Sequence, residues 1–416
     1  MTAARSLRDA PWLKTGPAAR VLALLNADGE EARVVGGAVR NALLGVPVGD
    51  IDIATTALPD VVVRRAAVAH IKSVPTGIAH GTVTLVADGQ PFEVTTLRED
   101  VETFGRKATV VFGRDWTRDA LRRDFTVNGL SVDADGKVYD HVGGLNDIEQ
   151  RRVRFIGEPS KRIAEDYLRI LRFFRIHAAY GEGEVDREGY LACIAGRDGL
   201  ASLSAERMRM EMLKLVVADG AVAALVAMED AGLLLAVTGG VSYRGPFAAL
   251  AGIARDLGLK PDPVRRLGTL CVAVSEDAKR LAQRLRLSNA EAKQLDSMGH
   301  RWWRMVGMGD AKSRRLLYRL GPDAYRERLM LAWARSGSAV TPERWRELAT
   351  LSERWAAPKF PLKAADFIAR GVPEGPALGQ ALGLAEDAWL AQNFPLDAGS
   401  LNEIADPIAA RFNGAQ

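Results

Sequence analysis

Two aspartates separated by one residue, Asp50 and Asp52, are the side chains in this chain best suited to metal chemistry. If Asp50–Ile53 is a strand, both carboxylates lie on one face and both isoleucines on the other. Neighbouring carboxylates repel each other, so a cation is their natural partner. Carboxylate oxygens suit Mg²⁺, which commonly takes one or two carboxylates together with the phosphates of a substrate. The pair therefore predicts a magnesium site.

A glycine pair shortly before these acids predicts a phosphate-binding turn. Gly36 and Gly37 separate a strand-like run, Ala32–Val35, from a helical pattern, Ala38–Leu44. Glycine allows a tight turn and a close approach of the backbone to a ligand, and the free N–H groups of a helix start attract anions. Arg40 adds a cation suited to phosphate oxygens. Together with the acids, the turn predicts chemistry on a nucleoside triphosphate; the alternative is a plain surface turn before an edge strand.

A third acid, Glu93, lies on the second strand of a predicted hairpin. The runs 80–86 and 91–96 flank Asp88 and Gly89, and Asp-Gly between β-rich runs is a hairpin signal. If this strand lies beside the two aspartates, three carboxylates could hold two metal ions. The alternative is an exposed glutamate on an edge strand.

These features resemble the head of the class II tRNA nucleotidyltransferases and bacterial poly(A) polymerases, in the polymerase-beta superfamily. The shared motif is GG-x-V-R followed by D-x-D; the chain departs from it at Asn41, where the family usually has Asp. In the family, an acid in the setting of Glu93, ahead of T-T-x-R, completes the metal site. The segment R-R-D-F-T-x-N-G, which begins at Arg122, implies that Arg123 contacts the incoming nucleotide and that Asp124 orients the nucleotide or its ribose. Helix capping or a turn hydrogen bond is the alternative role for Asp124.

The run Glu165–Ala178 predicts an amphipathic helix with one strongly polar side. At about 100° per residue, that side carries Asp166, Arg169, Arg172 and Arg175. A carboxylate only accepts hydrogen bonds and a guanidinium only donates them, so Asp166 and Arg169 would form an edge that fits cytosine and adenine. Uracil and guanine would place an acceptor against the carboxylate, and such unpaired groups discriminate strongly. The motif E-D-x-x-R-x-x-R-x-x-R also resembles the family's, which implies that Arg172 and Arg175 support the site or bind phosphate.

Two further segments resemble the family. The polar, poorly periodic run Glu99–Asp115 is expected to be a loop, and it is similar to the family's flexible loop that helps switch from C to A addition. The segment Leu203–Leu215 is similar to a helical motif in which Glu206 and Arg207 would brace the nucleotide helix. An ordinary surface ion pair is the alternative for Glu211.

The order of predicted elements divides the chain into a mixed part and a helical part. We expect an α/β N-terminal nucleotidyltransferase head, with a polymerase-beta-like mixed sheet and helices, followed by an all-α C-terminal region. The expected domains are a catalytic head at 1–150, a helical neck with the base-selecting helix at 151–218, and a helical body and tail at 219–416. Basic clusters in the last part suit an RNA phosphate backbone.

Composition limits the class of protein and its partners. The 416 residues include 56 Lys and Arg against 52 Asp and Glu, a net charge of +4, which permits a nucleic-acid partner without requiring one. We find neither a signal-peptide pattern nor a run of roughly 18 apolar residues that could cross a membrane. Two distant cysteines favour a reducing compartment. A cytoplasmic enzyme is expected.

The resemblance implies template-independent, Mg²⁺-dependent addition of CCA, from CTP and ATP, to the 3′ end of tRNA. Three alternatives stay open: a poly(A) polymerase on the same scaffold, a specialist that adds only CC or only A, and an inactive RNA-binding protein. The strand leading to Glu93, T-G-x-x-H-G-T-V-T, is similar to the tRNA enzymes. The intact acids and the E-D-x-x-R set argue against an inactive protein.

Overall fold

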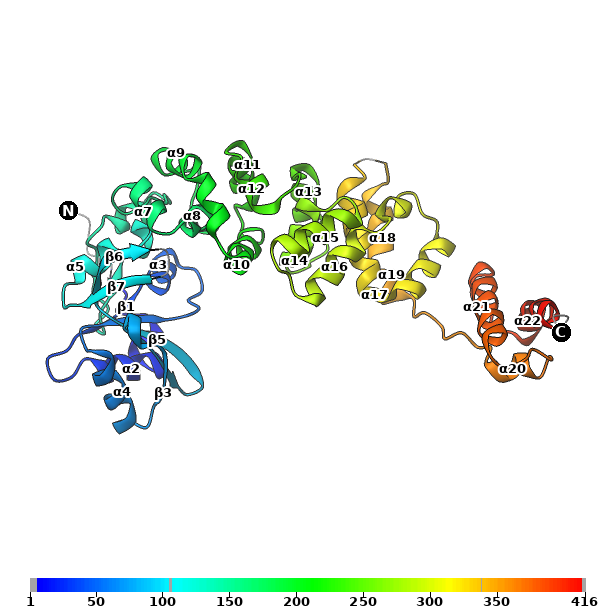
Figure 1. Cartoon of the computed structure of the whole chain (residues 1–416), viewed down its shortest axis with the longest axis horizontal. Coiled ribbons are helices and arrows are strands. Elements are labelled where there is room, and N and C mark those ends of the chain that lie inside the picture. Colours follow the sequence, from blue (N-terminus) through cyan, green and yellow to red (C-terminus); the bar gives the residue numbers. More distant parts are fainter. Residues whose placement is uncertain (1–5, 105–106, 338, 414–416) are drawn as a thin grey trace. The chain divides into compact units, whose positions relative to one another are not determined.

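The computed structural model describes residues 6–104, 107–337 and 339–413, and the side chains of residues 76, 79 and 99–110 lie outside this description. The chain forms two compact units: Met1–Ser242 with Arg284–Arg286, and Tyr243–Gln283 with Leu287–Gln416 (Figure 1). The expected head and neck thus fall within one unit, and the expected division at 150 and 218 stays a prediction. Within the described residues, we find no helix with the length and apolar character needed to span a membrane.

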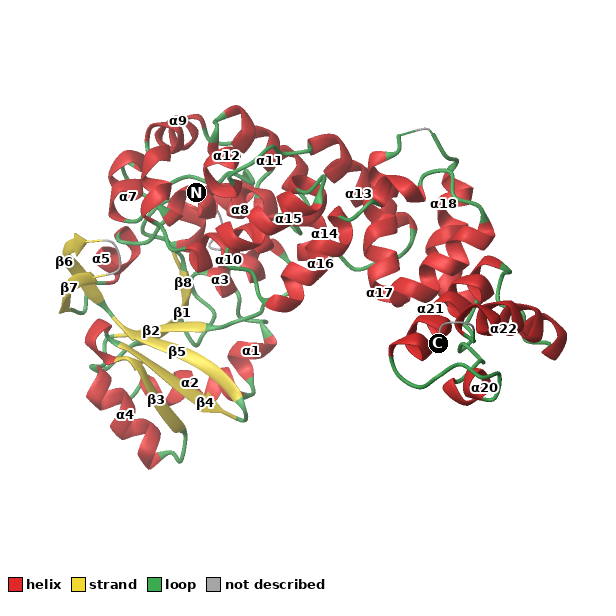
Figure 2. Ribbon diagram, turned by 45° about the vertical axis from the view of Figure 1, so that its right-hand side comes forward, coloured by secondary structure: helices red, strands yellow, loops and turns green. Residues whose placement is uncertain are grey.

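A seven-stranded mixed sheet forms the centre of the head, as expected from the sequence (Figure 2). Its strands, in spatial order, are β3 (Lys72–Gly77), β4 (Thr82–Ala87), β5 (Gln90–Thr96), β2 (Asp52–Thr55), β1 (Ala32–Val35), β8 (Ser131–Val132) and β9 (Val138–Tyr139). The β2–β5 pair is parallel, and the other pairs are antiparallel. The hairpin predicted around Asp88 and Gly89 is confirmed by the pairing of β4 with β5.

A separate two-stranded sheet stands where the sequence predicted a loop. Strands β6 (Arg98–Phe104) and β7 (Lys107–Phe112) pair antiparallel, with Arg98 opposite Phe112. The loop expectation for Glu99–Asp115 was therefore wrong. The missing periodicity favoured a loop, but the run Ala-Thr-Val-Val-Phe in β7 is rich in β-branched residues, which favour strands.

Short helices cover the head sheet. Helices α2 (Pro17–Leu25) and α4 (Pro59–Val68) pack on the sheet with a buried apolar face (Figure 2). The others are α1 (Pro11–Lys14), α3 (Gly37–Leu44), α5 (Trp116–Leu121), α6 (Gly144–Glu149) and the 3₁₀ turns η1 (Ile78–His80) and η2 (Thr126–Asn128). Helix α3 follows β1 directly, which confirms the predicted strand–glycine–helix turn.

The rest of the first unit, which includes the predicted neck at 151–218, consists of helices, one of which differs from the prediction. They are α7 (Pro159–Glu165), α8 (Leu168–Tyr180), α9 (Arg187–Ala195), η3 (Arg197–Ser202), α10 (Ala205–Leu215), α11 (Ala221–Asp230) and α12 (Leu233–Thr238). The single helix expected over Glu165–Ala178 was wrong, because the backbone is extended at Asp166, with φ −158° and ψ 106°. The Asp166 carboxylate accepts the N–H of Leu168 at 3.1 Å, a local bond that competes with helix continuation.

Aromatic packing joins the neck to the head within the first unit. The ring of Phe125, from the head, lies with its centroid 4.9 Å from that of Phe155, and Phe155 stacks on Phe173 of α8 at 5.3 Å. All three rings are buried. Because buried aromatic pairs add to area burial, this cluster fixes α8 against the head.

The second unit is helical, as predicted. It contains α13 (Arg244–Asp256), α14 (Pro263–Cys271), α15 (Ser275–Arg284, whose last residue belongs to the first unit), α16 (Asn289–Gly299), η4 (Trp302–Met305), α17 (Asp310–Arg335), α18 (Pro342–Ala349), α19 (Leu351–Arg354), α20 (Ala364–Ile368), α21 (Pro376–Ala391) and α22 (Ala398–Phe412). A kink at Gly321, with φ 74°, precedes Pro322 and divides α17. Two apolar clusters, around Trp345 and around Trp389, form the core of this unit.

Candidate active site

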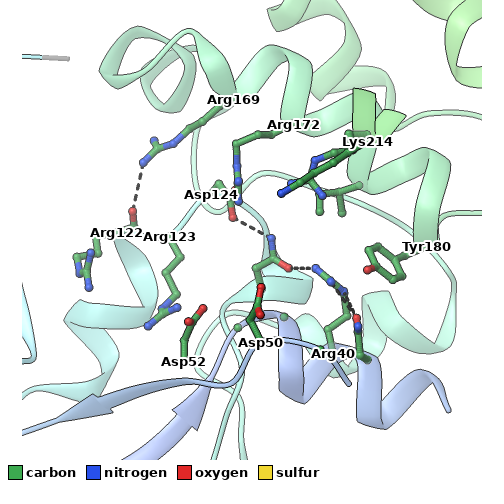
Figure 3. A pocket seen from close by; sticks show the side chains of 17 residues that line it. Arg40, Asp50, Asp52, Arg122, Arg123, Asp124, Arg169, Arg172, Tyr180 and Lys214 are labelled. Atoms are coloured by element: carbon green, nitrogen blue, oxygen red, sulfur yellow. Dashed lines mark hydrogen bonds and ion pairs between the residues drawn. The ribbon is translucent and has the colours of Figure 1, made fainter. Parts of the chain in front are cut away.

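A polar cavity of about 650 Å³ lies in the first unit, between the start of α3, strand β2 and helices α8 and α10 (Figure 3). It is lined by Gly36, Gly37, Arg40, Asn41, Gly49, Asp50, Asp52, Arg122, Arg123, Asp124, Asn128, Arg169, Arg172, Arg175, Ile176, Tyr180 and Lys214. All the predicted site residues except Glu93 and Asp166 are among these. The structure therefore brings together motifs that are up to 139 residues apart, from Gly36 to Arg175.

The three predicted metal ligands come from neighbouring backbone positions. Asp52 is the first residue of β2, and Glu93 lies beside it on the parallel strand β5, one position before the paired residues Ile53 and Val94. Asp50 precedes β2, so the prediction that both aspartates share one strand was wrong. Burial raises the pKa of Asp52, the charges of Glu93 and Asp50 raise it further, and Arg123 partly opposes them.

These carboxylates offer the right atoms for a divalent cation. Asp50, Asp52 and Glu93 accept no hydrogen bond or ion pair from the described side chains, and desolvation together with the charges of Glu93 and Asp50 raises the pKa of Asp52. Among the described residues, however, no three His, Cys, Asp or Glu side chains converge into a ready metal site. Mg²⁺ needs only one or two carboxylates when substrate phosphates and water complete its shell, so the donor set fits such an ion.

The glycine turn brings the backbone of α3 to the wall of the cavity. Gly36 has φ 70° and ψ −126°, a conformation that side chains other than glycine rarely adopt. A Cβ atom at Gly36 would lie 3.5 Å from Nη1 of Arg123. This distance is an ordinary van der Waals contact, so glycine is favoured here by its positive φ and not by space. The turn places the N-terminal N–H groups of α3 at the cavity.

Arg40 is held in place by neutral partners. Its Nε and Nη2 donate to Oδ1 of Asn41 at 3.2 and 2.9 Å, and its Nη1 donates to Oδ1 of Asn128. The ring of Tyr180 covers the guanidinium at 3.7 Å. Burial is the main cause that lowers the pKa of Arg40. In the described structure, no carboxylate pairs with this arginine.

Asp124 makes the local turn hydrogen bond that the sequence analysis gave as its alternative role. It also forms an ion pair with Arg172. Its carboxylate accepts the N–H of Phe125 at 2.9 Å, Nδ2 of Asn128 at 3.0 Å and Nε of Arg172 at 2.7 Å. Burial alone would raise its pKa, but the charge of Arg172 and these hydrogen bonds hold it below the usual value. A continuous chain of contacts thus runs from Arg40 through Asn128 and Asp124 to Arg172 (Figure 3).

The other arginines of the cavity each have an acidic partner. Arg169 pairs with Glu165, Arg172 with Asp124, Arg175 with Glu211, and both Arg122 and Arg123 with Asp119. Glu211 is buried and not a surface ion-pair residue. It also lies 3.8 Å from Arg172, so α10 braces α8 through this acid.

The predicted acceptor–donor edge is not assembled in this structure. Asp166 pairs with Arg207 at 2.6 Å and Arg169 pairs with Glu165, so the two base-reading candidates face other partners. Arg207 braces the α7–α8 junction as expected. Glu206 does not, because its partner is the exposed Arg286 at 2.8 Å.

Sequence reasoning missed Tyr180 and Lys214. Tyr180 lies eight residues after Arg172 on α8, and Lys214 lies three residues after Glu211 on α10. Both spacings are helical and would have identified these residues as extensions of polar faces. The motif match ended before each of them.

Comparison with known proteins agrees with this architecture. Residues 32–154 match the family described as the poly A polymerase head domain, and residues 185–238 match a probable RNA and SrmB-binding site of polymerase A. The chain is 30% identical to the mitochondrial CCA tRNA nucleotidyltransferase 1 of Mus musculus over 388 residues, which cover 90% of this chain and 86% of that protein. It is 42% identical to a CCA-adding enzyme of Geobacillus thermodenitrificans over 216 residues, 51% of this chain and 52% of that protein.

A solved structure gives the same result for the fold. The chain superposes on a Bacillus stearothermophilus CCA-adding enzyme, crystallised in complex with CTP, with a TM-score of 0.74 and 26% identity, covering 97% of this chain and 100% of the other. A Thermotoga maritima CCA-adding enzyme complexed with tRNA shares the fold at 17% identity, with a TM-score of 0.69. The chain belongs to the family of CCA-adding tRNA nucleotidyltransferases, and its residues 32–154 form a poly A polymerase head domain.

Proposed function

We propose that this protein adds C, C and A to the 3′ end of tRNA, using CTP and ATP without a nucleic-acid template. The observation that carries the proposal is the cavity itself, in which unpaired carboxylates, a glycine turn and the arginines of α8 line one space in a chain of this family. In the reaction, the terminal hydroxyl of the RNA attacks the α-phosphate of the nucleotide, and pyrophosphate leaves.

Enzymes of this family generally use a divalent metal ion, and we propose Mg²⁺. Asp50 and Asp52, with Glu93 beside them, are the residues that would hold it. When bound, such an ion neutralises charge on the phosphates and lowers the pKa of a bound hydroxyl. The chain's own contribution is to bind and orient both substrates, which is the main source of catalysis in phosphoryl-type transfer.

The nucleotide contacts proposed here follow from the positions of the lining residues. Gly36, Gly37 and Arg123 would hold the triphosphate, and Arg40 would attract it through its uncompensated charge. Asp166 and Arg169 would read the base after exchanging their present partners, Arg207 and Glu165, for the nucleotide. Arg172 and Arg175 would keep α8 in place through Asp124 and Glu211.

One assay separates the proposal from its rivals. A tRNA that lacks CCA is incubated with labelled CTP, ATP and Mg²⁺, and the products are resolved at single-nucleotide length. Ordered addition of three nucleotides supports the proposal. A long A tail would identify a poly(A) polymerase, arrest after two C residues or a requirement for a CC end would identify a specialist, and no incorporation would identify an inactive RNA-binding protein.

The cellular compartment stays a prediction. Both cysteines, Cys193 and Cys271, are free and buried, which agrees with the expected reducing compartment. Vertebrate relatives are named mitochondrial, so membership of the family is compatible with more than one location. Fractionation of the native cells is the measurement that decides between them.

A further inference from the structure

The cations that line the cavity differ in whether an acid already balances their charge. Five arginines, named above, each pair with Asp119, Asp124, Glu165 or Glu211. Of the described cations in the lining, only Arg40 and Lys214 have no carboxylate partner. These two side chains therefore supply the positive charge that is still available to an anionic ligand.

Lys214 extends into the cavity from α10, on the side where Tyr180 covers Arg40 (Figure 3). It lies three residues after Glu211, so the two side chains share one face of α10. Glu211 is buried and binds Arg175, whereas Lys214 is exposed. The same helix face thus provides a structural acid for α8 and, less than one turn later, a free ammonium group for the cavity.

We propose that Lys214 is a substrate-binding residue that contacts a phosphate group at the Arg40–Tyr180 end of the cavity. This inference rests on the function proposed above and adds a contact to it. A lysine ammonium is a compact charge with three rotatable donors, which suits a phosphate whose position changes as the primer grows. The phosphate can belong to the triphosphate of the incoming nucleotide or to the backbone of the RNA primer.

The test uses the full-length chain and three substitutions of Lys214. Lys214→Ala and Lys214→Gln remove the charge, and Lys214→Arg keeps it. For the first two we expect the KM for one substrate to rise about tenfold, the loss typical of one charge-assisted hydrogen bond, with a much smaller change in kcat. Lys214→Arg should restore most of the affinity. Because the side chain is exposed, the melting temperature should stay the same, as circular dichroism would show.

The pattern of the change identifies the source of the phosphate. A higher KM for CTP and weaker inhibition by pyrophosphate, with an unchanged KM for tRNA, assign the contact to the triphosphate. A higher KM for tRNA alone, with a salt dependence reduced by about one charge, assigns it to the primer backbone. Both outcomes support phosphate binding by Lys214.

Lys161→Ala is the matched control, because Lys161 is an exposed lysine that pairs with Glu158 on α7, outside the cavity lining. It should leave both KM values unchanged. If Lys214→Ala and Lys214→Gln also match the wild type, the inference is wrong while the proposed function stands. If the wild type itself adds no nucleotide to tRNA, the proposed function is wrong instead.

Discussion

Asp52 is the carboxylate whose ionisation the fold opposes most clearly in the candidate site, because burial, Glu93 and Asp50 all raise its pKa above the ordinary value of 3.8. An acid with a raised pKa contributes stability at low pH and loses it as the pH rises through the folded-state pKa. Because Asp52 is still exposed to solvent, which screens these charges, its ionised form destabilises the metal-free protein only slightly at neutral pH. A bound divalent cation would reverse this effect.

We predict that Asp52→Asn abolishes nucleotide addition but leaves the metal-free protein as stable as the wild type, or more stable, at about pH 7. The advantage should shrink as the pH falls toward about 4, where the wild-type acid becomes protonated. Thermal melts across this range, with and without MgCl₂, measure it; Mg²⁺ should stabilise only the wild type. Asp60→Asn, at an exposed acid on α4, is the control. A variant clearly less stable than the wild type at neutral pH would contradict the proposed electrostatics.

At the residue scale, the sequence predicted most of the cavity lining, because each motif holds its residues in local helical or strand spacing. Asp50 was misplaced because the strand begins two residues later, at Asp52. Tyr180 and Lys214 were missed because the motif match ended before each of them, although their helical spacing continues the polar faces of α8 and α10. The burial of Glu211 and its ion pair with Arg175 also could not be predicted, because the spacing of residues along the sequence does not record tertiary contacts.

At the scale of the element, the break between α7 and α8 shows that a helical periodicity can continue across a point where the helix itself ends. The polar side continues through Asp166, but the side chain of that residue bonds the backbone and pairs with Arg207, so the helix stops and restarts. Strand β3 escaped prediction because its sequence, KSVPTG, contains a proline and a glycine, both of which disfavour strands.

This junction predicts an effect on base choice. Asp166→Ala and Arg169→Ala should both weaken discrimination against UTP and GTP, because each removes half of the proposed reading edge. Arg207→Ala should also weaken it without touching the nucleotide, because Arg207 braces the α7–α8 junction from which both side chains would reach the base. Single-turnover incorporation with each of the four nucleotides measures the ratio. Glu206→Ala, at the neighbouring exposed acid on α10, should keep wild-type fidelity; unchanged fidelity in all three variants would reject the proposed edge.

The β6–β7 hairpin allows a cleaner deletion than the sequence suggested. Arg98 pairs with Phe112, so the two ends of the segment between them lie side by side, and a short Gly-Ser link can replace residues 99–111. We expect this deletion to abolish A addition while C addition persists, as the family's flexible loop implies. The seven-stranded sheet does not include β6 or β7, so the melting temperature should change little. Equal loss of both additions would contradict this role.

At the scale of the whole molecule, the chain divides into two compact units, and two apolar clusters, around Trp345 and around Trp389, belong entirely to the second unit. Composition and helical periodicity predicted the all-α character of this unit. The grouping of Arg284–Arg286 with the first unit could not be predicted, because it depends on contacts between distant segments that no local pattern records.

A fragment ending at Ser242 should fold, but less stably than the full chain. It loses the exposed Arg286–Glu206 ion pair, the hydrogen bonds from Arg284 to the carbonyls of Ala236 and Val237 and the buried side chain of Leu285. The loss of a buried leucine side chain costs about 2–5 kcal/mol. We expect the fragment to bind CTP and to lose affinity for tRNA, as calorimetry and filter binding would show. A fragment ending at Met228 also loses the buried Leu233, Leu234 and Val237 of α12 and should not fold. Failure of the longer fragment to fold would show that the two units stabilise each other.

The side-chain amide of Asn128 has one more consequence. It donates to Asp124 and accepts from Arg40. The negative charge of Asp124 is already neutralised by Arg172, whereas the positive charge of Arg40 has no carboxylate partner among the described residues. An aspartate at this position would cancel the charge of Arg40 and repel Asp124, whereas the amide transmits position and no charge. The neutral amide of Asn128 thus holds Arg40 in position without neutralising its positive charge. The site can therefore be rigid and still attract an anionic substrate.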